Sequence, residues 1–301
     1  MPPATIQELA SRGTDLLAAR DCTVLGPPRH DLVDPLFESQ AYFRLLGPEP
    51  WSSVQVQRVL RPQLADLDSE HFPVASLRLS ALFKEPDEPP QGLMLDLLRA
   101  MGFELEQRDV RFADQARRNA VLGLQGVGWR LLIDGVDSGW LSYFQRAASQ
   151  VLEPVTLALS LDLERLALLQ QRSLSLYDVD WAPGLSYGEA RAAEEAELSK
   201  LFGGPAREDA EVEAHVDEVC RRAMELLDDG LILEAFVLAH EAVVGACRRG
   251  ASLEEAAAAW QTRVGAVVDF CARRWLEERR RDGFPLSPDA SRSGVIRRLG
   301  V

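Results

Sequence analysis

Cysteine and histidine are scarce in this sequence, with four of each among 301 residues, and neither type clusters. The cysteines form no C-x-x-C pair, which argues against a zinc site and against the disulfide framework of a small secreted domain. Among the histidines, His240 lies alone in an apolar run, where helix packing is a simpler role than metal binding. The sequence therefore predicts no metal site, and reduced thiols in a cytoplasmic protein.

The chain also has fewer basic than acidic residues and contains no long apolar run. The chain has 33 Lys and Arg against 47 Asp and Glu, a formal net charge of −14, which argues against DNA binding and other non-specific contacts with phosphate backbones. No run of about 18 apolar residues occurs, since Glu234 interrupts even the stretch 230–239, so we expect no membrane span. Residues 1–6 lack the basic and apolar regions of a signal peptide.

The first two-thirds of the chain contains short apolar runs separated by turn residues. The runs at 77–83, 129–133, 140–144 and 155–161 are strand-like. Asp134-Gly135, after the second run, is a strong hairpin signal. The run Leu93-x-Leu95-x-x-Leu98-x-x-Met101 before Gly102 predicts a helix closed by a glycine cap, and Asp162 predicts the N-cap of another. Hairpins followed by helices indicate an α+β fold with an antiparallel sheet.

The last third differs, because alanine-rich helical patterns replace the strands after about residue 190. Apolar residues recur at spacings of three and four from Leu253 to Trp275, which predicts one face of a helical bundle. The arginines that follow suit the C-terminal end of that helix. We therefore expect a core at residues 1–200 and a helical C-terminal domain at 201–301.

Several strings are too specific for composition to explain. They are LGPEPW at 46–51, GVGW at 126–129, YFQ at 143–145, LER at 163–165, DWAPG at 180–184, YGE at 187–189 and GFPL at 283–286. Their order and spacing resemble the α subunit of bacterial glycyl-tRNA synthetase from roughly residue 22 to residue 286. The resemblance implies a class II aminoacyl-tRNA synthetase core, an antiparallel sheet flanked by helices, followed by a helical C-terminal domain.

The same resemblance implies an activity and partners. The family's α chain activates glycine with ATP, so ATP and Mg²⁺ are the expected cofactors if this chain is active, and none is expected otherwise. It also implies a homodimer formed through the core near residues 46–51, where two prolines stiffen the backbone beside Trp51. A turn packed within one subunit is the alternative. A β-subunit-like chain is the second implied partner, and tRNA is contacted only indirectly.

The residues expected to bind ATP are kept only in part. By the resemblance, Arg61 and Arg165 are the catalytic arginines, and Glu164 joins them in ATP binding. The alternative for Arg165 is an ion pair with Glu164 or Asp162. The family loop RPTDGRYGENPNR keeps its first Arg-Pro here and continues as QLADLDSEH at 63–71. Both later arginines are lost, and the acids that replace them repel a triphosphate.

The expected glycine pocket departs from the family as well. By the resemblance it is lined by Trp129, Trp140, Tyr143 and Gln145. The family string TQFTYFQQVGG is GWLSYFQRAAS at 139–149, so Trp140 replaces an amide and a glycine pair is lost. Trp140 either reshapes a pocket meant for the smallest amino acid or points into the core. The family's acidic EDNWESP also becomes basic, DQARRNA at 114–120.

The third motif is mixed, because the family's YGLER becomes LDLER at 161–165 and Asp162 puts negative charge where a glycine borders adenine. We favour a divergent paralogue with a degenerate ATP and glycine site that acts as a binding or accessory subunit. One alternative is an active glycine–tRNA ligase α subunit that works with a β subunit. The other is an adenylate-forming or tRNA-dependent enzyme repurposed for another small acid.

Overall fold

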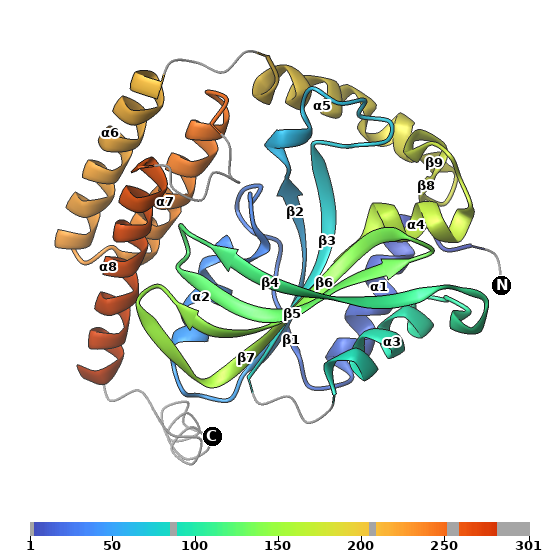
Figure 1. Ribbon diagram of the computed structural model, residues 1–301, viewed down its shortest axis with the longest axis horizontal. Helices are drawn as coiled ribbons and strands as arrows, with labels where there is room; N and C mark the ends of the chain where they lie inside the picture. The colour runs from blue at the N-terminus through green and yellow to red at the C-terminus, as the bar shows by residue number, and fades with distance from the viewer. Residues whose placement is uncertain (1–2, 85–88, 205–208, 252–258, 282–301) are drawn as a thin grey trace, which may run out of the picture.

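The computed structural model describes residues 3–84, 89–204, 209–251 and 259–281. A seven-stranded sheet forms its centre and carries helices on both faces (Figure 1). The short β1 pairs parallel with β2, and the other neighbouring strands pair antiparallel. In the sheet order the strands are β1 (Thr23–Val24), β2 (Ser52–Leu60), β3 (Ala75–Lys84), β7 (Gln150–Asp162), β6 (Val136–Ala147), β5 (Leu124–Ile133) and β4 (Val110–Asn119). A separate ribbon consists of β8 (Asp180–Ala182) and β9 (Leu185–Ser186).

The β5–β6 hairpin forms where the sequence predicts it. Asp134 (φ 51°) and Gly135 (φ 82°) both adopt the left-handed conformation that a tight hairpin turn between twisted strands requires. Asp134 tolerates this conformation because its side chain is well bonded: it accepts a hydrogen bond from the Asp109 N–H at 2.9 Å and pairs with Arg108 at 2.5 Å. The four predicted strands are confirmed as parts of β3, β5, β6 and β7.

Three helices cover the apolar face of the sheet: α1 (Ile6–Ala18), α3 (Pro90–Ala100) and α4 (Leu163–Gln171). Gly102, with φ 94°, follows α3 as predicted. Asp162 is the predicted N-cap of α4 and accepts a hydrogen bond from the Arg165 N–H at 3.1 Å. The strand residues beneath these helices are large and aliphatic, and they include Leu79, Leu131, Leu141, Leu159 and Leu161.

The opposite face carries α2 (Ser39–Leu46) and three long helices, α6 (Asp209–Asp228), α7 (Ile232–Cys247) and α8 (Ala259–Arg281), which stand together at the left of Figure 1. They follow α5 (Tyr187–Phe202). The predicted apolar stripe of α8 is buried at Trp260, Val264, Val267 and Cys271, whereas Leu253 lies outside the described residues. Short 3-10 helices are η1 (Pro35–Phe37), η2 (Pro62–Leu64), η3 (Leu105–Gln107) and η4 (Leu176–Asp178).

One apolar cluster joins the sheet, α2 and the C-terminal helices. Tyr42 of α2 stacks on Phe236 of α7 with ring centres 4.9 Å apart, and Phe43 lies 4.9 Å from Trp275 of α8. The predicted α+β class, a largely antiparallel sheet flanked by helices, is confirmed. The division into domains at residue 200 falls inside α5 and stays a prediction. Within the described part of the chain, no helix is long and apolar enough to cross a membrane.

His240 of α7 also connects the helices to the core. Its imidazole is 1% exposed, and its Nε2 accepts a hydrogen bond from the Val33 N–H at 3.2 Å. Burial, followed by the neighbouring His30, lowers the pKa of His240 to about 3, so the ring is neutral near pH 7. The structure agrees with the helix-packing role that the sequence predicts for this residue.

We expect His240 to make the protein less stable in acid. Its pKa is about 3 in the folded chain and about 6.5 in an unfolded one, so unfolding takes up a proton below about pH 6.5 and stability falls as the pH decreases. Between about pH 6.5 and 5 this residue should remove about 2 kcal/mol. His240→Gln keeps an acceptor for the Val33 N–H but does not titrate. The difference between urea-unfolding free energies at the two pH values should therefore shrink by that amount, and an unchanged difference would contradict the assignment.

Candidate functional site

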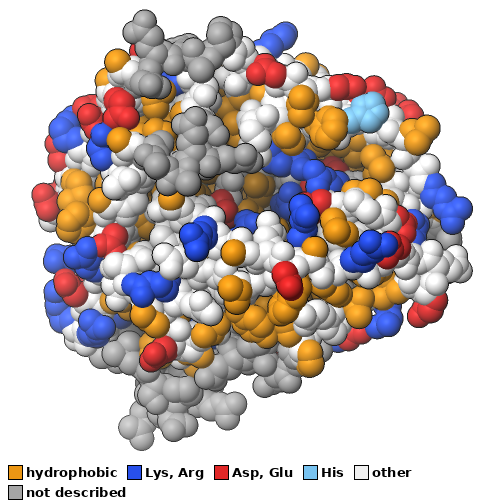
Figure 2. All heavy atoms as spheres, viewed as in Figure 1, with side chains coloured by type: hydrophobic (Ala, Val, Ile, Leu, Met, Phe, Trp, Pro, Cys, Tyr) orange, Lys and Arg blue, Asp and Glu red, His pale blue; other side chains and the backbone are white. Residues whose placement is uncertain are grey.

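Polar side chains cross the sheet on the face that carries α2 and the C-terminal helices. Gln57 of β2, Arg78 of β3 and Asp162 of β7 lie opposite one another in the strand register. A second row runs beside them and consists of Gln55, Ser80, Ser160 and Trp140. Figure 2 shows Lys and Arg side chains bordering a hollow near the middle of the molecule. Polar rows across a sheet centre point to a ligand-binding face, because such positions are otherwise apolar.

Asp162 holds three arginines together at one end of these rows. Its Oδ2 lies 3.3 Å from Nη1 of Arg61, 3.2 Å from Nη2 of Arg78 and 3.6 Å from Nε of Arg165. Arg61 follows β2, Arg78 belongs to β3 and Arg165 lies in the first turn of α4. We call these four residues the arginine cluster. It brings the two predicted catalytic arginines together, with a carboxylate between them.

The Asp162 carboxylate is fixed and ionised. It is fully buried, and burial alone would raise its pKa, but the charges of Arg78, Arg61 and Arg165 outweigh burial and hold the pKa below its usual range. Its Oδ1 accepts the N–H of Arg165 at the start of α4, so the fold determines its position. The ion pair with Asp162 that we gave as the alternative role of Arg165 is therefore present.

The Glu164 carboxylate binds the backbone of β3. Both of its carboxylate oxygens accept the backbone N–H of Leu77, at 2.8 and 2.9 Å, and the residue is 3% exposed. Burial, followed by the nearby charge of Asp162, raises the pKa of Glu164, which favours its neutral form. Three guanidinium charges thus face one carboxylate charge. A role for Glu164 in ATP binding stays a prediction.

Some hydrogen-bond donors of the Arg61 guanidinium are unpaired among the described residues. The residue is 9% exposed, and its Nε and Nη2 are buried without a hydrogen-bond partner among the described residues. Buried donors without partners cost about 1–3 kcal/mol each, so the arginine cluster retains both the charge and the donors to take up a small anion. A triphosphate fits it less well, because the Asp162 carboxylate already lies among the guanidinium groups.

The four residues predicted to line the glycine pocket do not come together. Trp140 lies on the polar face, whereas Trp129 and Tyr143 pack against the apolar cluster on the other face, because side chains alternate along a strand. Gln145 is exposed at a register shift in β6. Trp140 is the member of the set that shares a face with the arginine cluster. Binding of an amino acid by these residues stays a prediction.

Trp140 fills most of the space beside the polar rows. The residue is 7% exposed and meets Phe144 edge-on, with ring centres 6.4 Å apart. The guanidinium of Arg117 from β4 lies 3.7 Å from the centre of its ring. The cavity that Trp140 borders together with Gln55 and Ser80 has a volume of only about 20 Å³, which is room for about one water molecule. The polar rows are therefore present, but the cavity next to Trp140 is small.

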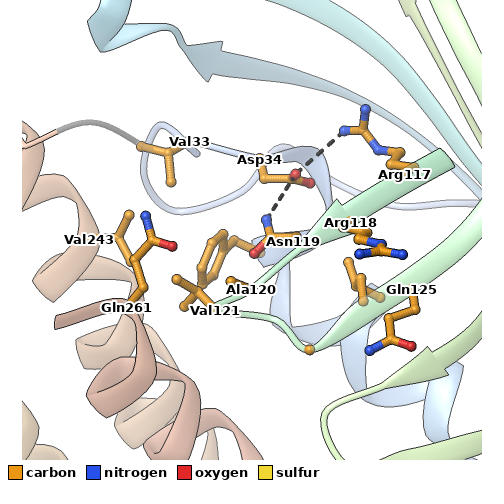
Figure 3. Close-up of a pocket in the computed structure, with 13 residues that line it drawn as sticks. Val33, Asp34, Arg117, Arg118, Asn119, Ala120, Val121, Gln125, Val243 and Gln261 are labelled. Atoms are coloured by element: carbon orange, nitrogen blue, oxygen red, sulfur yellow. Dashed lines mark hydrogen bonds and ion pairs between the residues drawn. The ribbon is translucent and has the colours of Figure 1, made fainter. Parts of the chain in front are cut away.

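A larger pocket is lined in part by Arg117 (Figure 3). Its volume is about 730 Å³, and its walls come from the β4–β5 hairpin, the segment before η1, and helices α7 and α8. In Figure 3, Asp34 points toward Arg117 and Asn119, with an ion pair at 3.5 Å and a hydrogen bond at 3.1 Å. The sequence of the basic stretch at 114–120 indicated a change of charge relative to the family. It did not indicate the pocket, because α7 and α8, which form part of its wall, are distant in the sequence.

The loop that replaces the family's arginine-rich segment is anchored through Asp66. Asp66 accepts a hydrogen bond from the Gly204 N–H at 2.9 Å. Asp68, Glu70 and His71 offer possible metal-ligand atoms within 4.8 Å of one another. They lie at the surface, and the contact of His71 Nδ1 with Asp68 at 3.0 Å accounts for their proximity without a metal.

The fold and the site together define a class. A largely antiparallel sheet with Arg61 after β2 and Arg165 after β7 on one polar face is that of a class II aminoacyl-tRNA synthetase-like protein. The sequence profile described as "Glycyl-tRNA synthetase alpha subunit" matches residues 6–280. The chain belongs to this family.

Two relatives illustrate the match. The glycine–tRNA ligase alpha subunit of Coprothermobacter proteolyticus is 30% identical over 289 residues, which cover 94% of this chain and 98% of that protein. A chloroplastic/mitochondrial glycine–tRNA ligase of Arabidopsis thaliana is 27% identical over 299 residues. That match covers 94% of this chain but only 27% of the plant protein, so this chain spans about a quarter of its length.

Similar solved structures are more distant. PylSc of Desulfitobacterium hafniense, a pyrrolysyl tRNA synthetase, has a TM-score of 0.42 at 11% identity, covering 62% of this chain and 77% of that one. A second pyrrolysyl-tRNA synthetase structure from the same organism has a TM-score of 0.39 at 14% identity, with the same coverage. Likenesses of this size say nothing about activity.

We expect the Asp162 charge to be essential to stability. Asp162→Asn keeps a side chain able to cap α4 but leaves three arginines with no buried counter-ion, and breaking such a pair costs about 3–5 kcal/mol. Asp137→Asn is the matched control, because Asp137 faces Arg130 at 4.0 Å with both side chains nearly half exposed; that change should cost less than about 0.5 kcal/mol. Urea unfolding measures both, and equal losses would show that the Asp162 contacts contribute no more than a surface pair.

Proposed function

We propose that the chain is a divergent α-subunit paralogue that does not activate glycine by itself and acts as a binding or accessory subunit. One observation carries the proposal: the ionised carboxylate of Asp162 lies between Arg61, Arg78 and Arg165. In the family pattern, this position is a glycine and the arginines meet phosphates. An internal carboxylate therefore occupies the side of the guanidinium groups that a nucleotide needs.

Electrostatics supports this interpretation. Two unit negative charges about 4 Å apart repel each other by about 4 kcal/mol at the dielectric typical of protein sites. Asp162 does not move aside easily, because it ends β7 and caps α4. The loop at 63–71 supplies no Lys or Arg to offset the repulsion and contains Asp66, Asp68 and Glu70. A triphosphate thus meets more negative and less positive charge than in the family pattern.

Trp140 gives independent support. Amino-acid activation needs the carboxylate of the amino acid held against the α-phosphate. The cavity that Trp140 borders together with Gln55 and Ser80, about 20 Å³, is smaller than any amino acid. The Trp140 indole borders this cavity at a position where the family has an amide. The Arg117 guanidinium lies against the indole ring and restricts its movement.

An active glycine–tRNA ligase α subunit using ATP and Mg²⁺ is the second candidate, and a specific observation favours it. Arg61 keeps two buried donors without a partner among the described residues, and three guanidinium charges face the single charge of Asp162. A site with this imbalance attracts an anion. The relative from Coprothermobacter proteolyticus, matched over 98% of its length, carries the name of a ligase subunit.

Partners follow from the same family. We propose a homodimer formed through the core and a β-subunit-like chain as the second partner, because the relative matched over 98% of its length is named an alpha subunit. Within the chain, Leu46 is 8% exposed and Trp51 is half-buried. Light scattering at micromolar concentration should give about twice the chain mass of 33.3 kDa. A mass equal to one chain would favour the alternative of a turn packed within one subunit.

The decisive experiment restores the family residue. The native chain should bind Mg-ATP at best in the millimolar range and show no glycine-dependent ATP–pyrophosphate exchange. Asp162→Gly removes the internal carboxylate. Glycine as an N-cap costs only a few tenths of a kcal/mol, but loss of the buried counter-ion costs about 3–5 kcal/mol, so urea unfolding first has to show that this variant is folded. Calorimetry should then show ATP binding at least about tenfold tighter, because the guanidinium groups regain an anionic ligand.

Two further variants make the result specific. Arg165→Ala in the Asp162→Gly background should cancel the gain, because it removes one of the freed guanidinium groups. Asp114→Gly, which removes an exposed carboxylate of β4, should leave ATP affinity unchanged. Micromolar ATP affinity in the native chain, abolished by Arg165→Ala and accompanied by pyrophosphate exchange with glycine, would establish the ligase function in place of our proposal.

A further inference from the structure

A pocket with four arginines lies where α3 and α4 end, on the face of the sheet that α1, α3 and α4 cover. The arginines are Arg12 of α1, Arg99 of α3, Arg108 after η3 and Arg172 after α4. We call it the helix-end pocket. Its volume of about 370 Å³ lies within the range of small-molecule sites, about 300–1,000 Å³. Arg165 lies in the first turn of α4 and Arg172 follows its last residue, so about 10 Å of helix separates this pocket from the arginine cluster.

Backbone carbonyls hold the guanidinium groups of Arg12 and Arg108 at the end of α4. Nη1 of Arg12 donates to the carbonyl oxygen of Met101 at 3.4 Å. Nη2 of Arg108 donates to the carbonyl oxygen of Leu169 at 3.0 Å. Gln170 connects the two places, because it follows Leu169 and its Nε2 donates to the same Met101 carbonyl at 3.1 Å. Both guanidinium groups are thus held beside Gln170, which also lines the pocket.

The acids that pair with these arginines lie outside the lining of the pocket. The pairs are Arg12 with Glu8 at 3.8 Å, Arg99 with Asp96 at 3.2 Å and Arg108 with Asp134 at 2.5 Å. Among the described lining residues, Glu104 is the one acid against four arginines. Gln107 donates a hydrogen bond to this carboxylate at 2.5 Å. The groups that face the pocket are therefore mainly positive.

Arg172 adds a guanidinium that the fold does not use. The residue is exposed, and its guanidinium makes no hydrogen bond or ion pair with any residue that the structure describes. The hydrogen bond from Arg108 contributes most to a lowered pKa of Asp134, and the charge of Arg172 contributes further, so Arg172 lies near that pair. As the C-cap of α4 it adopts a left-handed conformation, φ 54°, which glycine or asparagine adopts more easily. An unpaired arginine at a strained position points to a ligand and not to a role in the fold.

The number of guanidinium groups indicates the size of the anion. Arginines also stabilise the C-terminal ends of helices, but two helix ends together carry only about one unit of negative charge, which does not require four arginines. A guanidinium binds a phosphoryl group through two parallel hydrogen bonds. A terminal phosphoryl group offers about three acceptor oxygens and so accommodates about two guanidinium groups in this way. Four guanidinium groups therefore match two linked phosphoryl groups.

We propose that the helix-end pocket binds a diphosphate group, either as inorganic pyrophosphate or as part of an organic diphosphate. Arg12 and Arg108 hold the group from the end of α4, Arg99 approaches it from the end of α3, and Arg172 supplies the unpaired charge. The inference does not depend on the loss of glycine activation, because no residue of the arginine cluster lines this pocket.

The test is calorimetry on the full chain in the absence of Mg²⁺, with pyrophosphate, inorganic phosphate and ADP as probes. Pyrophosphate should bind at least about tenfold tighter than inorganic phosphate, because it engages more guanidinium groups. ADP that binds as tightly as pyrophosphate would identify an organic diphosphate as the ligand, and weaker binding of ADP would identify the inorganic ion. Arg172→Gln and Arg99→Gln should each weaken pyrophosphate binding by about tenfold or more. Arg222→Gln, at an exposed arginine of α6, should leave it unchanged.

A further variant separates ligand binding from a role in the fold. Arg172→Gly removes the guanidinium and places at this left-handed position the residue that adopts it most easily. This variant should lose pyrophosphate binding while its midpoint of urea unfolding stays at or above that of the native chain. A lower midpoint would show that Arg172 stabilises the fold and would contradict the assignment.

Four binding results would overturn the proposal. They are no binding of pyrophosphate at millimolar concentration, equal binding of pyrophosphate and inorganic phosphate, equal binding by the native chain and Arg172→Gln, and loss of binding in Arg165→Ala with retention in Arg172→Gln. The last result would assign the anion to the arginine cluster. Glycine-dependent pyrophosphate exchange by the native chain would overturn the proposed function, but it leaves the expected effect of Arg172→Gln on binding unchanged.

Discussion

A buried carboxylate, that of Asp162, has three guanidinium groups within 3.6 Å of one oxygen. Burying charges is costly unless each finds a partner, so the end of β2, the middle of β3 and the start of α4 are held together by a charge balance that none of these elements supplies alone. Asp162 also caps α4. Replacing it therefore changes the ion pairs of the polar face, the start of a helix and the charge offered to a ligand.

The two faces of the sheet differ in composition and in what they contact. Aliphatic residues from β3, β5, β6 and β7 pack beneath α1, α3 and α4 on one face. The other face combines polar rows with the apolar cluster under α2 and the C-terminal helices. Trp140 lies where these two environments meet, and Arg117 covers it. Trp140 borders the small cavity beside the second polar row, and Arg117 lines the larger pocket.

Local features of the fold were predictable from the sequence, because short-range chemistry determines them. The Asp134-Gly135 turn, the Gly102 cap and the N-cap role of Asp162 depend on neighbours within a few residues. The site was predictable only in part. Arg61 and Arg165 meet as expected, but β7 enters the sheet between β3 and β6, and this long-range pairing brings Arg78 to Asp162. Strand parity then separates Trp129 and Tyr143 from Trp140, which a shared motif string does not reveal.

Family membership leaves the chemistry open, because a fold does not determine what its site does. In this chain the scaffold of the family is kept while charge is redistributed along one face. The loop after β2 lacks arginines and gains acids, Asp162 adds a carboxylate beside the kept arginines, and Arg117 and Arg118 add positive charge at the end of β4. Anions are attracted toward the end of the face where guanidinium groups remain uncompensated. Arg61, whose Nε and Nη2 have no hydrogen-bond partner among the described residues, lies at such a place.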